Sequence, residues 1–438
     1  MMDLKLRNGI EEKVYNFLSG IIMPAMSVLF LCTNTVLNKW MGERAETIQN
    51  LIAIIVVLAF AVIILSKPKE RIPQWLRMNY LVVAYLVVRI ISLWKSGFDY
   101  SVGRTVFFEI FYLVGICFFS NVDKNKKIFY VKFFVWFEFL MTFASLAVYY
   151  ICTYVTTGIS DMLIKLTYFE KSGNALAFSN PNTAGIFAGF GIVLAIVIYG
   201  EKIFSKKFTV LYGMYNAVAM ILFGCRSADM GVLAVIFTII FFMIFRKVDK
   251  RKFTVAVLLM ATATLIPIYG LVHYGESSSA LSYTPIEIKV DSLSTGRYII
   301  WKECVITQKD HEIFGHGNLN LEQQARKEFI SGIDQNYYWR YTWAADLGPH
   351  NGYIAMVSGT GWAGLTLFIA ILFQRIMRTK NLRKDRRYLI LIFTFIINCF
   401  ESLFILNRFF TCFYMLLILN ESSENDDKEQ QLLTREVN

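Results

Sequence analysis

Long uncharged runs recur along the chain, and they limit what it can fold into. Four of them are 18 to 24 residues long: Thr47–Ser66, Phe208–Cys225, Phe253–Tyr274 and Asn351–Gln374. A helix needs roughly 20 apolar residues to cross about 30 Å of hydrocarbon, so each run is long enough to span a membrane. The runs are continuously apolar and do not alternate with polar residues, which argues against a membrane β-barrel.

Weaker apolar runs complete a predicted set of about twelve transmembrane helices. They are Phe17–Asn34, Met78–Trp94, Thr105–Ser120, Ile128–Tyr154, Thr183–Gly200, Met230–Phe245, Tyr388–Leu403 and Arg408–Asn420. The composition is 56% hydrophobic and only 18% charged, well away from that of an ordinary soluble domain. The first run lacks a small-residue cleavage site, so we interpret it as an anchor and not as a signal peptide. The sequence therefore predicts an all-α polytopic membrane protein.

Positive charge is concentrated in alternate loops. The net charge is +11, and the two termini with the loops on their side carry 27 Lys and Arg residues. The short loops on the opposite side carry at most two each. Because basic loops stay on the cytoplasmic side, both termini are predicted to be cytoplasmic. This topology accounts for the basicity, and no nucleic-acid partner is expected.

One hydrophilic segment breaks the pattern of short loops. Residues 272–349 have a net charge of −3 and lie between predicted helices nine and ten, on the outer face. Loops of this length usually have a function of their own, so we expect the chemistry there. The predicted organisation is transmembrane helices 1–9 over residues 1–271, an extracytoplasmic loop with catalytic elements over 272–349, helices 10–12 over 350–420, and a polar cytoplasmic tail over 421–438.

Short helices are predicted inside this loop. One spans Ser294–Gln308, with Ser294 or Thr295 as its N-cap. A second runs from Leu321, capped by Asn320, to Ser331, where Gly332 ends it.

Four polar clusters lie at predicted outer helix ends. They are Asn180-Pro181-Asn182, Arg226-Ser227, Gly296-Arg297 with Trp301, and Asp346 with His350-Asn351. Taken singly, each has a structural explanation, as a helix start, a snorkelling or solvated arginine, or an interfacial histidine. Their shared face instead predicts one outward site with two or more cations and a histidine that can transfer a proton. Such a site suits a lipid-linked diphosphate whose sugar protrudes into water.

The remaining charged residues, and the residue types that can bind metals, give weaker indications of a functional site. Glu401 and Arg408 flank the last outer turn, where they either extend the site or pair across it. Arg89 and Glu109 either pair with each other or line the cavity for the lipid. The seven cysteines are scattered without a CxxC pair, and His311 and His316 lack metal-ligand spacing. We expect no metal and no cofactor.

Several short motifs of the chain resemble those of a known family. His350-Asn351, followed after nine residues by Gly361-Trp-Ala-Gly364, is similar to the HN-x9-G-x-x-G signature of the O-antigen ligase and O-antigen polymerase family of bacterial membrane glycosyltransferases. Gly296-Arg297 with Trp301, and Phe314-Gly-His-Gly317, resemble the family's GR…W and fGxG segments. Arg226 matches its arginine turn, although Cys225 precedes it where Ser is usual. The resemblance covers roughly residues 178–375.

The resemblance implies an inverting, metal-independent transfer of glycan from undecaprenyl diphosphate to an acceptor hydroxyl, at the outer face of the bacterial inner membrane. Arg226 and Arg297 would hold the diphosphate, and His350 would take the acceptor proton. The remaining substrate-binding candidates are Asn351, Asp346, Asn180, Asn182, Trp301, Arg408 and Glu401, with Asp346 also placed to orient the imidazole. Implied partners are the lipid-linked donor, a glycan or lipid-glycan acceptor, membrane lipids, and flippase and chain-length regulator proteins.

Four functions stay open from the sequence. The preferred one is a polymerase that joins undecaprenyl-diphosphate-linked repeat units into capsule, exopolysaccharide or O-antigen. A ligase that moves finished glycan to lipid A-core or another acceptor would use the same motifs. A transporter of lipid-linked oligosaccharide would show internal repeats and polar breaks at the membrane midplane, which the sequence lacks. A non-catalytic scaffold would not need the two arginines and the histidine together.

Overall fold

The computed structural model is all-helical over the residues that it describes, apart from one isolated bridge between Thr35 and Phe178. The described residues are 10–35, 68–95, 124–155, 158–167, 181–276, 285–294, 296–317, 319–331, 343–379 and 386–402, with single positions at 178 and between 37 and 61. The helices are α1 (Ile10–Asn34), α4 (Pro68–Lys95), α6 (Lys124–Tyr154), α7 (Gly158–Thr167), α9 (Pro181–Glu201), α10 (Lys206–Phe223), α11 (Arg226–Ile244), α12 (Lys250–Ala263), α13 (Leu265–Glu276), α14 (Pro285–Leu293), α15 (Arg297–Thr307), α16 (Leu319–Ser331), α18 (Gly352–Arg378) and α19 (Tyr388–Ile397). The predicted all-α class is confirmed.

Five helical segments in the described part are long and apolar enough to cross a membrane. They are Ile128–Tyr154, Asn182–Gly200, Arg226–Ile244, Lys250–His273 and Gly352–Met377. Each coincides with a predicted span. The total of twelve stays a prediction. The predicted spans Phe17–Asn34, Met78–Trp94, Phe208–Cys225 and Tyr388–Leu403 fall largely on α1, α4, α10 and α19, which are not among these five segments. Thr105–Ser120, Arg408–Asn420 and much of Thr47–Ser66 lie outside the described residues, as does the tail 421–438.

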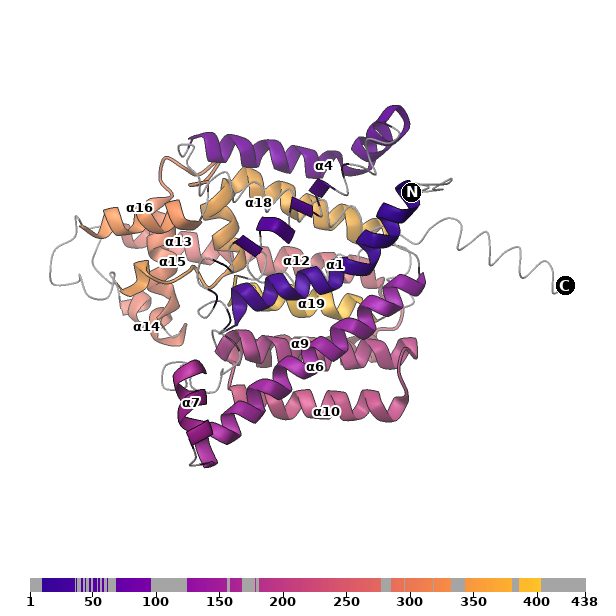
Figure 1. The fold of residues 1–438 in the computed structure, drawn as a ribbon. Helices are drawn as coiled ribbons and strands as arrows, with labels where there is room; N and C mark the ends of the chain where they lie inside the picture. Colours follow the sequence, from indigo (N-terminus) through magenta and orange to yellow (C-terminus); the bar gives the residue numbers. More distant parts are fainter. Residues whose placement is uncertain are drawn as a thin grey trace.

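The long helices lie side by side, and the short helices α14, α15 and α16 gather at one end of the bundle (Figure 1). α9 lies at the centre, where 78% of its apolar window is buried and it contacts α6, α10, α11 and α19. Its sequence is apolar on every side, as expected for a helix that is surrounded by others. This arrangement places the start of α9 at the same end as the short helices.

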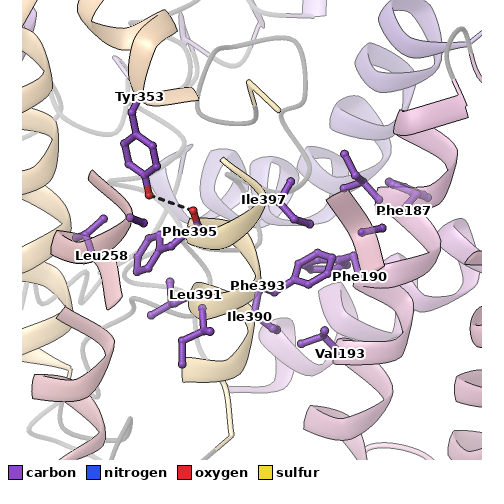
Figure 2. Close-up of a cluster of buried hydrophobic side chains, with 14 of the residues drawn as sticks. Phe187, Phe190, Val193, Leu258, Tyr353, Ile390, Leu391, Phe393, Phe395 and Ile397 are labelled. Carbon is purple, nitrogen blue, oxygen red and sulfur yellow. Dashed lines mark hydrogen bonds between the residues drawn. The ribbon is translucent and has the colours of Figure 1, made fainter. Parts of the chain in front are cut away.

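α19 connects the core to the end of the bundle that carries the short helices. Phe393 packs against Phe190 of α9, with ring centroids 6.1 Å apart (Figure 2). On another side, the Tyr353 hydroxyl in the first turn of α18 donates to the carbonyl oxygen of Phe395 at 3.2 Å. These contacts fix α19 between α9 and α18, and they fix the direction in which the chain leaves α19 toward Glu401.

The predicted helix over Ser294–Gln308 corresponds to α15, which begins three residues later than predicted and is separated from α14 by Gly296. α14 ends at Leu293 and α15 begins at Arg297, because Gly296 between them has a φ of +82°, which ends a right-handed helix. The N-cap is Gly296 and not Ser294, yet the Ser294 hydroxyl still accepts from the N–H of Tyr298 at 3.0 Å. Thr295 lies outside the described residues. α16 begins at Leu319, two residues before the predicted start, and ends at Ser331.

Candidate functional site

Glu401 lies at the centre of a polar cluster at this end of the bundle. It is fully buried, and its carboxylate contacts side chains from three other elements. Oε1 accepts from Nη2 of Arg297 at 2.9 Å and from Nδ2 of Asn182 at 2.8 Å. Oε2 lies 3.1 Å from Nδ1 of His350. The structure therefore brings three predicted site residues to a fourth.

The backbone at His350 adopts a conformation that is rare for a residue with a side chain. Its φ is +47°, in the left-handed region. The next residue, Asn351, caps α18: its Oδ1 accepts from the N–H groups of Tyr353 and Ile354, both at 3.0 Å. Its Nδ2 donates to the carbonyl oxygen of Cys399 at 3.0 Å. Strain of this kind persists only where surrounding contacts over-determine it, and it concentrates at functional sites.

The contact with Glu401 determines what the imidazole can do. A carboxylate beside Nδ1 holds the tautomer in which Nδ1 carries the proton. Nε2 of His350 is then an acceptor that can take a proton from a hydroxyl group. The side chain is 20% exposed, so the ring edge is accessible from outside the cluster.

Arg297 is the first residue of α15. A cation at a helix N-terminus opposes the helix dipole, and the Glu401 carboxylate offsets that cost here. The side chain is 22% exposed, and a guanidinium has five N–H donors, so most of them are available beyond Glu401.

Arg226 begins α11 next to the cluster without touching Glu401. Its side chain is exposed and has no ion-pair partner among the described residues. The preceding residue is anchored, because the Cys225 thiol lies 3.5 Å from the carbonyl oxygen of Asn182. Asn182 in turn holds Glu401, so the two arginines flank the same short stretch of chain.

The segment before His350 is held by two buried side chains. Trp301 on α15 is 9% exposed, and its indole N–H donates to the carbonyl oxygen of Pro349 at 2.9 Å. Arg326 on α16 is 1% exposed, and it donates to the carbonyl oxygens of Ala344 and Leu347 at 3.0 and 2.8 Å. Both therefore position His350 through the backbone.

The predicted glycine signature marks a break inside α18. Gly361 has a φ of +67° and a ψ of −177°, and residues 312–317 pair with the exposed backbone on both sides of it. The N–H groups of His316 and Gly317 donate to the carbonyls of Ser358 and Gly359 at 2.8 and 3.1 Å. The N–H groups of Trp362 and Ala363 donate to the carbonyls of Glu312 and Ile313 at 2.8 and 3.1 Å. Broken helices survive in a membrane when freed backbone groups are paired in this way.

Gly361 is required for its backbone conformation and not for close packing between helices. A Cβ at Gly361 would lie 2.1 Å from the carbonyl oxygen of Ile313, so the position needs glycine for its backbone. Arg89 of α4, 4% exposed, donates to the carbonyls of Gly317 and Gly359. A buried cation at the end of a half-helix is favourable. Its predicted alternative partner, Glu109, lies outside the described residues.

Asp346 does not orient the imidazole, in contrast to our expectation. Its carboxylate is 63% exposed and pairs with Lys327 at 2.8 Å. Glu401 takes the position beside the ring that we expected for Asp346. Asn180 and Arg408 lie outside the described residues.

The sequence predicted Glu401 as a substrate-binding candidate, but it did not predict that this carboxylate contacts Asn182, Arg297 and His350 at the centre of the cluster. The signal was available, because a carboxylate at the end of an apolar run is expensive unless it is paired. What could not be read was the pairing itself, since Asn182, Arg297 and His350 are separated from Glu401 by 219, 104 and 51 positions.

A second group of buried charges stabilises the loop helices. Arg326 lies 2.7 Å from Glu322 and 3.7 Å from Glu303. Burial raises the pKa of Glu303 to about 9, and it raises the pKa of Glu322 as well. Burial also lowers the pKa of His316 to about 4, so this histidine is neutral. No cluster of three or more metal-ligating side chains occurs in the described part of the chain.

Comparison with known proteins gives one family match. Residues 211–369 match the family model described as O-antigen ligase. The matched segment contains Arg226, Arg297 and His350, and the match supports the family that the motifs predict. Asn182 and Glu401 lie outside it. No curated protein and no solved structure matches the chain.

Proposed function

We propose that this member of the O-antigen ligase and polymerase family is a membrane glycosyltransferase. It joins undecaprenyl-diphosphate-linked repeat units into a surface polysaccharide at the outer face of the bacterial cytoplasmic membrane. The observation that carries the proposal is the buried Glu401 carboxylate, which contacts His350 on one oxygen and Arg297 on the other. A proton acceptor and an anion-binding cation are thereby held within one cluster.

His350 is the proposed general base. The acceptor hydroxyl donates its proton to Nε2 as its oxygen attacks the anomeric carbon of the donor sugar. Glu401 stabilises the imidazolium that forms, because its negative charge lies 3.1 Å from Nδ1. Attack opposite the leaving group inverts the anomeric centre.

Arg297 and Arg226 are the proposed anion-binding residues. The bond between the anomeric carbon and the diphosphate oxygen breaks as the new glycosidic bond forms, and negative charge develops on the diphosphate. Two permanently charged guanidinium groups stabilise that charge without a metal ion. Asn182 holds Glu401 beside Arg297 through its 2.8 Å hydrogen bond.

A ligase is the second candidate, favoured by the description of the matched family. Both activities use the same donor and the same proton transfer. They differ in the acceptor, which is another repeat unit for a polymerase and a finished lipid-linked core for a ligase.

The test is the surface-glycan profile of a deletion strain that carries wild-type or variant protein. His350→Ala should reduce transfer by about 10²–10⁴-fold, the usual effect of losing a general acid–base group. Glu401→Gln should also fall well below wild type, because the amide cannot balance the imidazolium charge. Arg226→Lys and Arg297→Lys should restore only part of the activity. Glu328→Gln removes an exposed carboxylate on α16 and serves as the matched control.

The outcomes separate the candidates. Single repeat units in the deletion strain support the polymerase, and unattached long chains support the ligase. An unchanged profile in the deletion strain, or wild-type chain length with normally inserted His350→Ala, would contradict the enzyme and favour the transporter or scaffold.

A further inference from the structure

Trp343 is an exposed aromatic side chain beside the Glu401 cluster, and the proposed mechanism does not use this side chain. Its side chain is 52% exposed. A Cβ built on Gly296 would lie 3.6 Å from two carbons of its six-membered ring, Cζ3 and Cη2, so the indole packs on that glycine. Gly296 immediately precedes Arg297, which contacts Glu401. One part of the ring therefore lies on the backbone of the site while much of its surface is open.

Buried contacts hold the backbone that follows Trp343. Ala344 and Ala345, the next two residues, are 0% and 1% exposed. The buried guanidinium of Arg326 binds the Ala344 carbonyl, and Trp301 binds the Pro349 carbonyl at the far end of the same segment. An open side chain on a fixed backbone is typical of a ligand contact, because its position does not have to be ordered on binding.

A lipid anchor is the alternative explanation for an exposed tryptophan in a membrane protein. Other exposed tryptophans, Trp94, Trp136 and Trp362, lie on the long helices α4, α6 and α18, where lipid is the natural neighbour. Trp343 instead lies between α16 and α18, in the hydrophilic segment 272–349 with its net charge of −3. Its place beside Arg297 favours a substrate contact.

Sugars have a chemistry that matches this surface. The C–H groups on one face of a pyranose form an apolar patch, and an aromatic ring offers a flat apolar surface with a negative potential. The indole N–H has no acceptor among the described residues, so it is available to a sugar hydroxyl. We infer that the open face of Trp343 is a stacking subsite for a sugar ring of the lipid-linked glycan. This inference rests on the proposed function, and it adds a contact to the glycan beside the contacts to the diphosphate.

The kinetic test uses the full chain, purified in detergent, with lipid-linked repeat units extracted from the deletion strain. Trp343→Leu should raise KM about tenfold and leave kcat within about twofold, because stacking contributes to binding and not to proton transfer. Trp343→Phe keeps a stacking face and should stay near wild type. Trp94→Leu replaces a tryptophan that is 76% exposed on α4 and should behave as wild type.

A binding test does not depend on turnover. The repeat-unit oligosaccharide, released from its lipid diphosphate, should perturb tryptophan fluorescence of the wild type and of His350→Ala, and the change should be lost in Trp343→Phe. An unchanged KM in Trp343→Leu, equal losses in the Leu and Phe variants, or a fluorescence change that survives in Trp343→Phe would each overturn the subsite. A deletion strain without accumulated lipid-linked oligosaccharide would instead contradict the proposed function itself.

Discussion

Two fully buried glutamates illustrate how local partners decide what a carboxylate does. Glu401 has an arginine, an asparagine and a histidine around it, and its charge is matched. Glu303 is equally buried, but neither of its oxygens is hydrogen-bonded among the described residues, and Arg326 stays 3.7 Å away. Arg326 is already paired with Glu322 at 2.7 Å. Burial therefore outweighs the attraction of Arg326 for Glu303, and Glu303 keeps its proton.

The protonation of Glu303 predicts a pH-dependent stability. Its pKa in the folded state, about 9, lies above the ordinary 4.5, so the stabilising contribution is complete below pH 4.5 and is lost as the pH rises toward 9. Between pH 7 and 9, the unfolding free energy of wild type should fall by about 1 kcal/mol per pH unit relative to Glu303→Gln. His316, whose pKa burial lowers to about 4, and Cys304, whose pKa burial raises well above 9, are present in both proteins, so their contributions cancel in the comparison.

Thermal unfolding of the two proteins at pH 7, 8 and 9 measures the difference. Glu328→Gln, on the exposed face of α16, should keep the wild-type slope. Parallel curves for wild type and Glu303→Gln would mean that Glu303 is ionised in the fold.

At the scale of elements, the backbone break at Gly361 in α18 is the place where the segment that follows the loop helix α15 binds to a membrane helix. Residues 312–317 form hydrogen bonds with the backbone groups that are unpaired within α18 at Gly361. Arg89 from α4 donates to the Gly359 carbonyl on the same side of the break. The first half of α18 begins at Asn351, directly after His350. A displacement at the break would therefore move the helix start that holds the imidazole.

Two glycines two residues apart test this connection. Gly361→Ala must place a side chain 2.1 Å from the Ile313 carbonyl at a positive φ, and we expect about 3 kcal/mol of destabilisation with loss of transfer. Gly359→Ala meets nothing within 4 Å and should keep wild-type stability and activity. Both are measured by thermal unfolding and by the surface-glycan profile. Equal behaviour of the two variants would show that the break does not constrain the site.

The elements differ in how far they could be predicted. The continuous apolar runs of α6, α9 and α11 specify membrane helices by length alone, so their positions were predictable. The split at Gly296 and the break at Gly361 were not, because the pairing that stabilises each conformation comes from distant backbone. Spacing indicated that Gly361 mattered, but a glycine for close packing and a glycine for a positive φ look the same in sequence.

At the scale of the whole molecule, candidate residues of the site could be predicted from the sequence, but the contacts between them could not. Polar clusters at helix ends identified Arg226, Arg297 and His350, because charged groups beside apolar runs stand out. The nearest carboxylate in sequence, Asp346, was the wrong partner, since it points to solvent and pairs with Lys327. Glu401 reaches the histidine only because α19 packs between α9 and α18.

The fold also has two chemically different ends, which leads to a prediction about topology. The site lies where α9, α11, α15 and α18 begin. At the opposite ends of α11 and α18, Arg251 donates to the Met377 carbonyl and Lys250 lies 5.0 Å from the Tyr388 ring. Because basic residues favour the cytoplasmic side, we expect that end in the cytoplasm and the site on the outer face.

An epitope inserted after Ser278, which lies outside the described residues, should be reached by antibody on intact spheroplasts. The same epitope inserted after Lys247, in the turn between α11 and α12, should be reached only after the membrane is permeabilised. Restored surface glycan in each strain shows that the tagged chain is folded. The reverse labelling pattern would place His350 and Arg297 on the cytoplasmic side and Lys250 and Arg251 on the outer side, and a transfer reaction at the outer face would then be contradicted.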